Sequence, residues 1–163
     1  MKKKSTIAVI AVLGVLAIGV AILAALNGRD AAPRQQLRSA EVFLIAAGET
    51  EHRVAMGDIE ALGPREIEAN YKKSGKDPET RTYTGAPFAA VLRHVGIDPA
   101  DFSSAAFSAA DGYSSILPME EALDEENCFI VIDHGGDGPF RMILAKAQFS
   151  QNWCKLLTNV ELK

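Results

Sequence analysis

An uncharged run of twenty residues, Ile7 to Leu26, follows three lysines at positions 2 to 4 after two intervening residues. The run contains only Ile, Val, Leu, Ala and Gly. A hydrocarbon core about 30 Å thick needs about 20 apolar residues in a helix. The pattern therefore predicts one transmembrane helix over residues 7–26. Basic residues favour the cytoplasmic side, so residues 1–6 are the expected cytoplasmic tail.

A cleaved signal peptide is the alternative interpretation of this segment. Such a peptide has an apolar core of about 7–15 residues and ends at an A-x-A-like site. Here the run is longer, and Asn27-Gly28-Arg29-Asp30 follows it. A lipoprotein signal needs a cysteine at this point, but the chain has cysteines only at positions 128 and 154. An uncleaved single-pass anchor is favoured, with the C-terminal part outside the cytoplasm.

The rest of the chain divides into a polar linker, residues 27–38, and one domain, residues 39–163. Three of the 17 basic residues and none of the 21 acidic ones precede residue 27. The part that follows therefore has 14 basic and 21 acidic residues, a net charge of −7. An acidic domain repels phosphate backbones, so nucleic acid is excluded as the expected partner.

The pattern of the domain indicates short strands mixed with short helices. Arg65 to Tyr71 alternates between apolar and polar residues, which is typical of a half-buried strand. Phe88, Val91, Leu92 and Val95 have helical spacing. The predicted fold class is α+β with a mixed β-sheet. The predicted strands are 41–46, 51–54, 65–71, one ending at residue 110, 113–117, 128–132, 140–144 and 156–162; the predicted helices are 58–62, 87–95 and 118–123.

No standard catalytic motif is present in the sequence. His134-Gly135-Gly136 is similar to the oxyanion loop of lipases, but no nucleophile elbow accompanies it, so a tight turn is favoured. The three histidines, at positions 52, 94 and 134, do not have the spacing of metal ligands. The acidic residues between 120 and 126 fit either a divalent-cation site or, more commonly, a solvated helix face.

Several single residues have two interpretations. Cys128 and Cys154 both fit core positions, and their redox context permits a disulfide without demanding one. Arg141, inside an apolar strand, is either on an exposed strand face or directed at an anionic ligand. Trp153 and Lys155 share a face, and fit either a core tryptophan with a solvated neighbour or a stacking shelf for a flat heterocycle.

The order of the motifs resembles the molybdopterin-binding domain of the sulfite oxidase family. The segments are DIEALGPREIEANY, TYTGAPFAAVLRHVGI, FSAADGYSSILPMEEAL, CFIVIDHGGDGPFRMIL and NWCKLLTNVEL. The shared features are a helix turn before an alternating strand, a Tyr-Thr-Gly-x-Pro helix start, an Asp-Gly-Tyr turn, a Gly-Pro-x-Arg strand and a Trp-x-Lys segment. The resemblance covers about Val54 to Leu162. It implies a sulfite oxidase-type fold with a pterin-shaped pocket.

One departure from the family concerns the metal. Catalytic members carry a cysteine after the alternating strand that ligates molybdenum, whereas residues 70–76 here read NYKKSGK. A thiolate is a strong soft ligand for this metal, and Tyr71 is a poor replacement. The resemblance therefore implies a stand-alone, membrane-anchored, extracytoplasmic member that binds a pterin or molybdopterin-like ligand without a metal. Such members act as sensors or partner proteins, here of another envelope protein, and have no catalytic residues.

The resemblance also implies a ligand site. The ligand would stack on Trp153 or Tyr113, and its polar edge would meet charged side chains. Two alternatives remain open: a molybdopterin-dependent oxidoreductase without a protein thiolate ligand, and a ligand-free envelope interaction scaffold that lacks an open pocket. The expected ligand-binding residues are Arg141, Trp153, Lys155, Tyr113, Asp111 and Tyr71.

Overall fold

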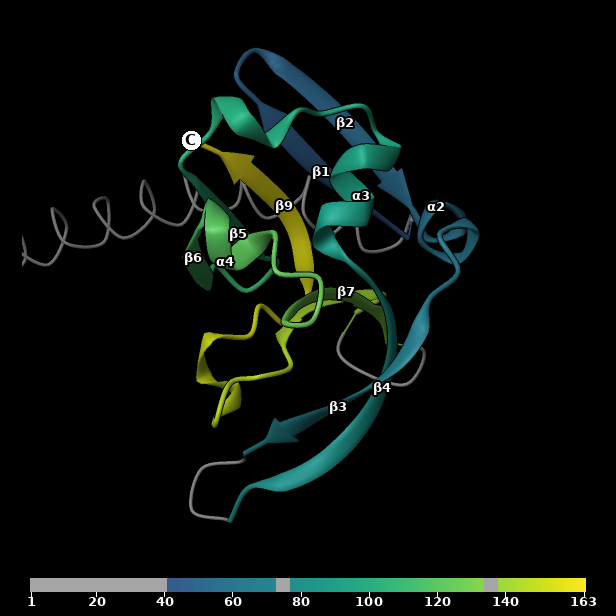
Figure 1. Cartoon of the computed structure of the whole chain (residues 1–163), viewed down its shortest axis with the longest axis vertical. Coiled ribbons are helices and arrows are strands. Elements are labelled where there is room, and N and C mark those ends of the chain that lie inside the picture. Colours follow the sequence, from purple (N-terminus) through teal and green to yellow (C-terminus); the bar gives the residue numbers. More distant parts are fainter. Residues whose placement is uncertain (1–40, 73–76, 134–137) are drawn as a thin grey trace, which may run out of the picture. The chain divides into compact units, whose positions relative to one another are not determined.

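The computed structural model describes residues 41–72, 77–133 and 138–163 of the chain (Figure 1). They lie in a folded unit that spans Leu37–Lys163. The predicted tail, transmembrane segment 7–26 and linker lie outside the described residues, as does the predicted turn at His134–Gly136. In the described part, no helix is long and apolar enough to cross a membrane.

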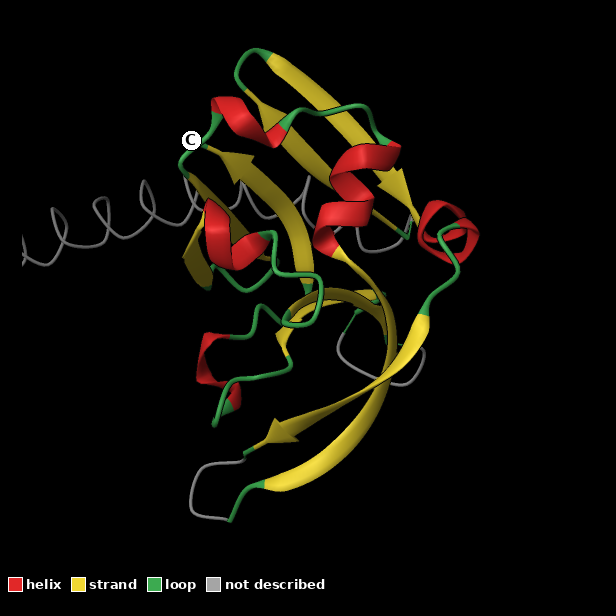
Figure 2. Ribbon diagram, in the orientation of Figure 1, coloured by secondary structure: helices red, strands yellow, loops and turns green. Residues whose placement is uncertain are grey.

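The described part is mostly β-structure, and the predicted α+β class is wrong. Strands account for 49% of it and helices for 20%, and the strands form two sheets instead of one (Figure 2). The prediction missed strand β4 (Glu79–Pro87), whose polar first half, together with Gly85 and Pro87, has the composition of a loop. That half is held as a strand by its pairing with the preceding strand.

The five-stranded sheet has the order β2-β1-β9-β5-β6. Strands β1 and β9 are parallel, and the other neighbours are antiparallel. The register of β5 against β9 shifts between Ser108 and Ala109. The strands are β1 (Val42–Ala47), β2 (Thr50–Ala55), β5 (Ser104–Ala109), β6 (Ser114–Pro118) and β9 (Leu157–Leu162).

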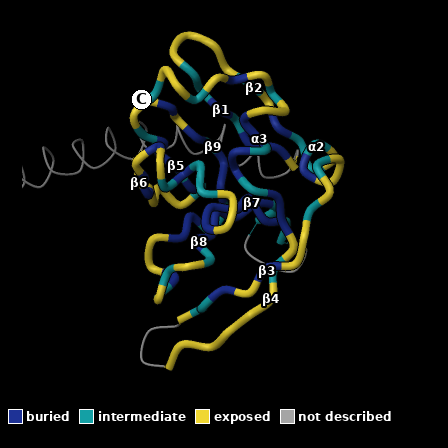
Figure 3. The backbone as a smooth tube through the Cα atoms, in the orientation of Figure 1, coloured by how far each residue is buried: buried dark blue, intermediate teal, exposed yellow. Residues whose placement is uncertain are grey.

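The four-stranded sheet is antiparallel, with the order β3-β4-β7-β8. It consists of β3 (Arg65–Tyr71), β4, β7 (Cys128–Ile132) and β8 (Phe140–Leu144). The outer half of β4, residues 79–82, is exposed, and Figure 3 shows it in yellow. The alternation that predicted β3 is confirmed, since Ile67 and Ala69 are buried between exposed glutamates.

The helices are short. They are α2 (Met56–Ala61), α3 (Phe88–His94) and α4 (Met119–Ala122), with two 3-10 turns, η1 (Pro99–Asp101) and η2 (Ser150–Asn152). The helix predicted from the spacing of apolar residues is confirmed as α3, because Phe88, Val91 and Leu92 are fully buried on one side of it. The Phe88 ring meets the Phe107 ring of β5 edge-on at 5.0 Å. This contact packs α3 against the five-stranded sheet.

One core joins the two sheets. The Phe43 ring of β1 meets the Phe140 ring of β8 edge-on, with 5.0 Å between centroids. Cys128 and Cys154 are both fully buried and free, so the structure contains no disulfide between them. They behave as small apolar core residues.

The chain passes from one sheet to the other just before β9. Cys154 pairs with Met142 of β8 through two backbone hydrogen bonds of 2.9 and 3.1 Å. Leu156 then adopts a φ of +57°, which is rare for a residue with a bulky side chain. The chain turns there and continues as β9. This crossing brings the 149–155 segment beside the end of β3 and the β5–β6 turn.

Candidate functional site

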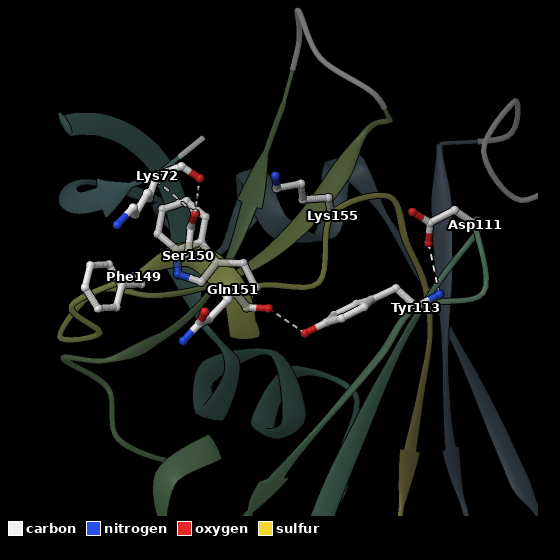
Figure 4. Close-up of a pocket in the computed structure, with 8 residues that line it drawn as sticks. Lys72, Asp111, Tyr113, Phe149, Ser150, Gln151 and Lys155 are labelled. Carbon is white, nitrogen blue, oxygen red and sulfur yellow. Dashed lines mark hydrogen bonds between the residues drawn. The ribbon is translucent and has the colours of Figure 1, made fainter. Parts of the chain in front are cut away.

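A cavity of about 490 Å³ lies where these three segments meet (Figure 4). One wall comes from the residue that follows β3, a second from the turn between β5 and β6, and the third from η2 and the residues on either side of it. The lining residues are Lys72, Asp111, Tyr113, Phe149, Ser150, Gln151, Trp153 and Lys155.

Side-chain hydrogen bonds hold η2 in place on both sides of the cavity. The Ser150 hydroxyl accepts from the Lys72 amide at 3.1 Å and donates to the Lys72 carbonyl at 3.3 Å. The Tyr113 hydroxyl donates to the Gln151 carbonyl at 2.7 Å, and the Asp111 carboxylate accepts from the Tyr113 amide at 3.0 Å (Figure 4). The cavity walls are thus tied together by residues distant in the sequence.

The cavity is cationic although the domain is acidic. Two lysines and one aspartate line it. The Lys72 ammonium lies 4.7 Å from the centre of the Phe149 ring, and the Lys155 ammonium lies 5.0 Å from the centre of the Tyr71 ring. Cations at these distances are attracted to the ring faces. The two ammonium groups are therefore positioned at the cavity by aromatic neighbours.

Trp153 forms a buried part of the wall. It is only 2% exposed, and its ring meets the Tyr83 ring edge-on at 5.4 Å and lies 6.2 Å from the Tyr71 ring. Trp153 is therefore a core tryptophan that borders the cavity and does not present an open stacking face. The exposed aromatic ring at the cavity is that of Tyr113, with 39% exposure.

Arg141 does not line the cavity. It is buried and forms an ion pair with Asp133, so it is not on an exposed strand face. Its guanidinium carbon lies 5.9 Å from the centre of the Tyr83 ring, whose edge contacts Trp153. Tyr83 thus connects Arg141 to the cavity wall without bringing the arginine into the cavity.

Three buried polar atoms around Tyr83 have no hydrogen-bond partner among the described residues. They are the Tyr83 hydroxyl oxygen, Nε of Arg141 and Nε1 of Trp153. Such atoms are rare in native structures, and each costs about 1–3 kcal/mol. Burial raises the pKa of Tyr83 against the opposing effect of nearby Arg141 and Arg81, so its hydroxyl remains a donor at neutral pH. The cluster offers donors directly behind Trp153.

The structure brings together four of the six expected ligand-binding residues, namely Asp111, Tyr113, Trp153 and Lys155. Tyr71 contacts Lys155 and Trp153 behind the wall, and Arg141 is one residue further away. The sequence analysis did not include Lys72 among the expected ligand-binding residues. It also missed Phe149, Ser150 and Gln151, whose only signal was a single apolar residue in a polar stretch.

Other charged clusters are surface ion pairs. Asp124, Glu125 and Glu126 each pair with a basic residue at 2.7 Å, namely Lys146, Arg93 and Arg65. Three of the five acidic residues between 120 and 126 thus form ion pairs at the surface. His94 lies 3.4 Å from Asp58. Within the described ranges, no three His, Cys, Asp or Glu side chains are grouped as metal ligands.

The residues at the cavity fit an organic ligand better than a metal. The segment after β3 has no cysteine in its sequence. Neither Cys128 nor Cys154 lines the cavity. Burial raises the pKa of the Cys154 thiol to about 12 and raises the pKa of Cys128 still further, so neither supplies a thiolate at neutral pH. Rings and two ammonium groups remain as the binding surface.

A solved structure has a fold similar to that of this chain. The chain superposes on the sulfane dehydrogenase SoxCD from Paracoccus pantotrophus with a TM-score of 0.59 and 14% sequence identity. The match covers 74% of this chain and 37% of that chain, so this protein corresponds to less than half of the enzyme. No family model matches the sequence, and no curated protein matches it. At this identity, the likeness shows that the two proteins share a fold and shows nothing about activity.

Proposed function

We propose that the cavity binds a flat heterocyclic ligand of the pterin or molybdopterin type, and that the domain is a sensor or partner protein without catalytic activity. The observation that carries this proposal is the convergence of aromatic rings and two lysines on one cavity in a sulfite oxidase-type fold. An open cavity also argues against the ligand-free scaffold. Location outside the cytoplasm and an envelope partner remain predictions from the sequence.

The shape and chemistry of the cavity support a flat ligand. A volume of about 490 Å³ lies within the usual range of about 300–1,000 Å³ for small-molecule sites. Tyr113 and Phe149 supply ring faces or edges from opposite segments, and aromatic rings favour offset or edge-on contacts with other flat rings. A planar heterocycle between these segments would bury its faces against them.

The two lysines indicate an anionic or acceptor-rich edge on the ligand. The ammonium groups of Lys72 and Lys155 each donate three hydrogen bonds and carry a full charge. Asp111 can accept hydrogen bonds from amino groups on the ligand.

A binding role fits the residues better than an oxidoreductase role. The family resemblance assigns the metal-ligand cysteine to the segment after β3, the place where Lys72 borders the cavity. A lysine ammonium repels a cationic metal centre and offers no soft ligand. If a molybdopterin were bound, these residues would hold its rings and its anionic groups, and the chain would add no ligand to the metal.

Fluorescence gives a direct test, because Trp153 is the only tryptophan of the chain. A reduced pterin titrated into the full-length protein should quench its emission in a saturable manner. Lys72→Ala and Lys155→Ala should each weaken binding by about tenfold, which corresponds to about 1.4 kcal/mol. Lys146→Ala is the matched control, since this lysine pairs with Asp124 away from the cavity.

Two results would contradict the proposal. Absence of saturable quenching by oxidised or reduced pterins would favour the scaffold. Near-equimolar molybdenum in the purified protein, together with oxidation of a sulfur oxyanion, would establish the oxidoreductase alternative.

A further inference from the structure

Strand β6 is an open edge of the five-stranded sheet. It pairs with β5 on one side and with no described residue on the other. Natural proteins usually protect such edges with charged side chains. The edge strands β2 and β3 carry exposed charges, such as Arg53 and Glu66, and β8 carries Arg141. Strand β6, with the sequence SSILP, has no charge.

Backbone groups of β6 point outward at alternate residues. The Ala109 amide donates to the Tyr113 carbonyl, and the Met119 amide donates to the Ser103 carbonyl. Residues 113 and 119 therefore face β5, as do the odd-numbered residues between them in an antiparallel ladder. The amide and carbonyl groups of Ser114 and Ile116 face outward. The carbonyl of Pro118 does so too, although its nitrogen has no hydrogen to donate.

The side chains at this edge are apolar in the middle and acidic at the ends. Ile116 is 64% exposed, and Ile116 and Tyr113 are the exposed large hydrophobic residues of the described part. Asp111 precedes the strand and Glu120 follows it, and both are exposed. Neither carboxylate forms an ion pair with a described residue.

These charges distinguish between two possible partners for the edge of β6, a second copy of this chain and a segment of another protein. In an antiparallel pair of two copies centred on Ile116, Ser114 of one copy lies opposite Pro118 of the other, so the turn at Asp111 of each copy faces the start of its partner's α4. Asp111 of each copy would then lie near Glu120 and Glu121 of its partner, and opposed like charges destabilise a strand pair. A segment with basic ends would instead complement both ends of β6.

We infer that β6 is a docking edge for an extended segment of a partner protein, with an apolar residue opposite Ile116 and lysine or arginine at its ends. The segment adds a sixth strand to the sheet through the outward groups of Ser114 and Ile116, a common mode of peptide recognition. The inference does not depend on a ligand in the cavity. Because Asp111 and Tyr113 also line the cavity, the partner would lie beside it.

A synthetic peptide tests the inference on the full-length chain. The probe has blocked termini, alternating valine and threonine, and a lysine at each end. In NMR titrations, its addition should shift the amide signals of residues 113–118 and slow the hydrogen exchange of Ser114 and Ile116. A peptide with glutamate ends, and one with N-methylated alternate amides, should each bind at least about tenfold more weakly.

Two variants of the chain complete the test. Ile116→Lys places a charge at the exposed centre of the edge and should weaken binding of the lysine-ended peptide by at least about tenfold. Thr50→Lys, an exposed position on the opposite edge strand β2, is the matched control and should bind normally. Equal binding by Ile116→Lys, or by the glutamate-ended peptide, would overturn the inference. Concentration-dependent dimerisation that Ile116→Lys abolishes would also overturn it, because the occupant would then be a second copy.

Discussion

The hydroxyl of Tyr113 donates a 2.7 Å hydrogen bond to the backbone carbonyl of Gln151, thirty-eight positions further along the chain. Tyr113 follows the β5–β6 turn of one sheet, and Gln151 lies in η2 beside the other. This bond joins two walls of the cavity at the junction between the two sheets. It connects the stability of the fold to the shape of the proposed binding site.

Tyr113→Phe tests that connection, because it removes the hydroxyl and keeps the ring. We expect the free energy of unfolding to fall by about 0.5–1 kcal/mol, the lower part of the range for a hydrogen bond, since the residue is partly exposed. Urea denaturation measures this. Pterin affinity should fall as well, because η2 loses one of its ties. An unchanged affinity together with unchanged stability would show that the bond does not position η2.

Ser150→Ala tests the second tie of η2. The serine is only 5% exposed, and its hydroxyl bonds both the amide and the carbonyl of Lys72. Its loss should cost about 1–3 kcal/mol, because partly buried backbone groups of Lys72 lose their partner. Gln151→Ala is the control, since this exposed side chain forms no hydrogen bond among the described residues. Equal unfolding midpoints for the two variants would contradict the inference that the Ser150 hydroxyl holds η2 against Lys72.

The ion pair between Arg141 and Asp133 predicts that the arginine is structural. The two side chains are 10% and 21% exposed, so Arg141→Ala leaves a mostly buried carboxylate without its partner. We expect a loss of about 3 kcal/mol, the lower end of the cost of breaking a buried pair. The double variant Asp133→Ala/Arg141→Met should be less destabilised than Arg141→Ala, because no lone charge remains. A single variant as stable as the native protein would contradict this.

Local patterns predicted most elements of the domain. The alternation of apolar and polar residues was sufficient to predict β3, and the helical spacing of apolar residues was sufficient to predict α3. Each pattern arises because only one side of the element is buried. The fold class was not predictable in the same way. Strand β4 has polar residues, a glycine and a proline, so its identity depends on pairing with β3 and β7 and not on its own composition. Because β4 was not predicted as a strand, the second sheet could not be recognised.

Residues of the candidate site were predictable only where they lie in motifs that occur in the same order as in the sulfite oxidase family. Asp111, Tyr113, Trp153 and Lys155 were grouped by resemblance, and the structure places all four at the cavity. Arg141 was included because the resemblance matched it to the arginine of the family's Gly-Pro-x-Arg strand. Its partner Asp133 lies on the neighbouring strand segment, and such a tertiary ion pair has no signature in the sequence. Ser150 was missed for the same reason.

The buried thiols predict a loss of stability at high pH. The pKa of Cys154 is raised to about 12 by burial, whereas an unfolded thiol has a pKa of about 8.5. Below about pH 8.5 both states hold the proton, and the stabilisation is fully present. As the pH rises towards 12, only the unfolded state releases it, so the stability falls.

This effect is measurable with Cys154→Ala under reducing conditions. Between pH 8 and pH 10, the native chain should lose about 2 kcal/mol more unfolding free energy than the variant does. The native thiols should also resist alkylation at pH 8 until urea unfolds the chain, because a buried neutral thiol is a poor nucleophile. Identical pH dependence in the two proteins, or rapid alkylation of the folded chain, would contradict the burial of Cys154.

Gly85 is expected to tolerate no side chain. It lies in β4 opposite Val131, and a Cβ atom at this position would lie 2.5 Å from the carbonyl oxygen of Ile130 and 2.8 Å from the Val131 Cα. Both neighbours are backbone atoms of the central strand β7, so the clash cannot be relieved by rotating a side chain. Gly85→Ala should therefore destabilise the domain by at least about 3 kcal/mol, the upper end of the range for overpacking.

Gly57→Ala is the matched control for this substitution. Gly57 lies in α2, and a Cβ atom at this position would have no other atom within 4 Å. The φ of Gly57 is not positive, so alanine can adopt the same backbone conformation. Alanine should stabilise this helix by up to about 1 kcal/mol, because glycine loses more backbone entropy on folding. Thermal unfolding of the two variants should therefore move in opposite directions. A Gly85→Ala variant with the same melting temperature as the native protein would contradict the close packing of β4 against β7. It would also contradict the arrangement of the four-stranded sheet on which the cavity depends.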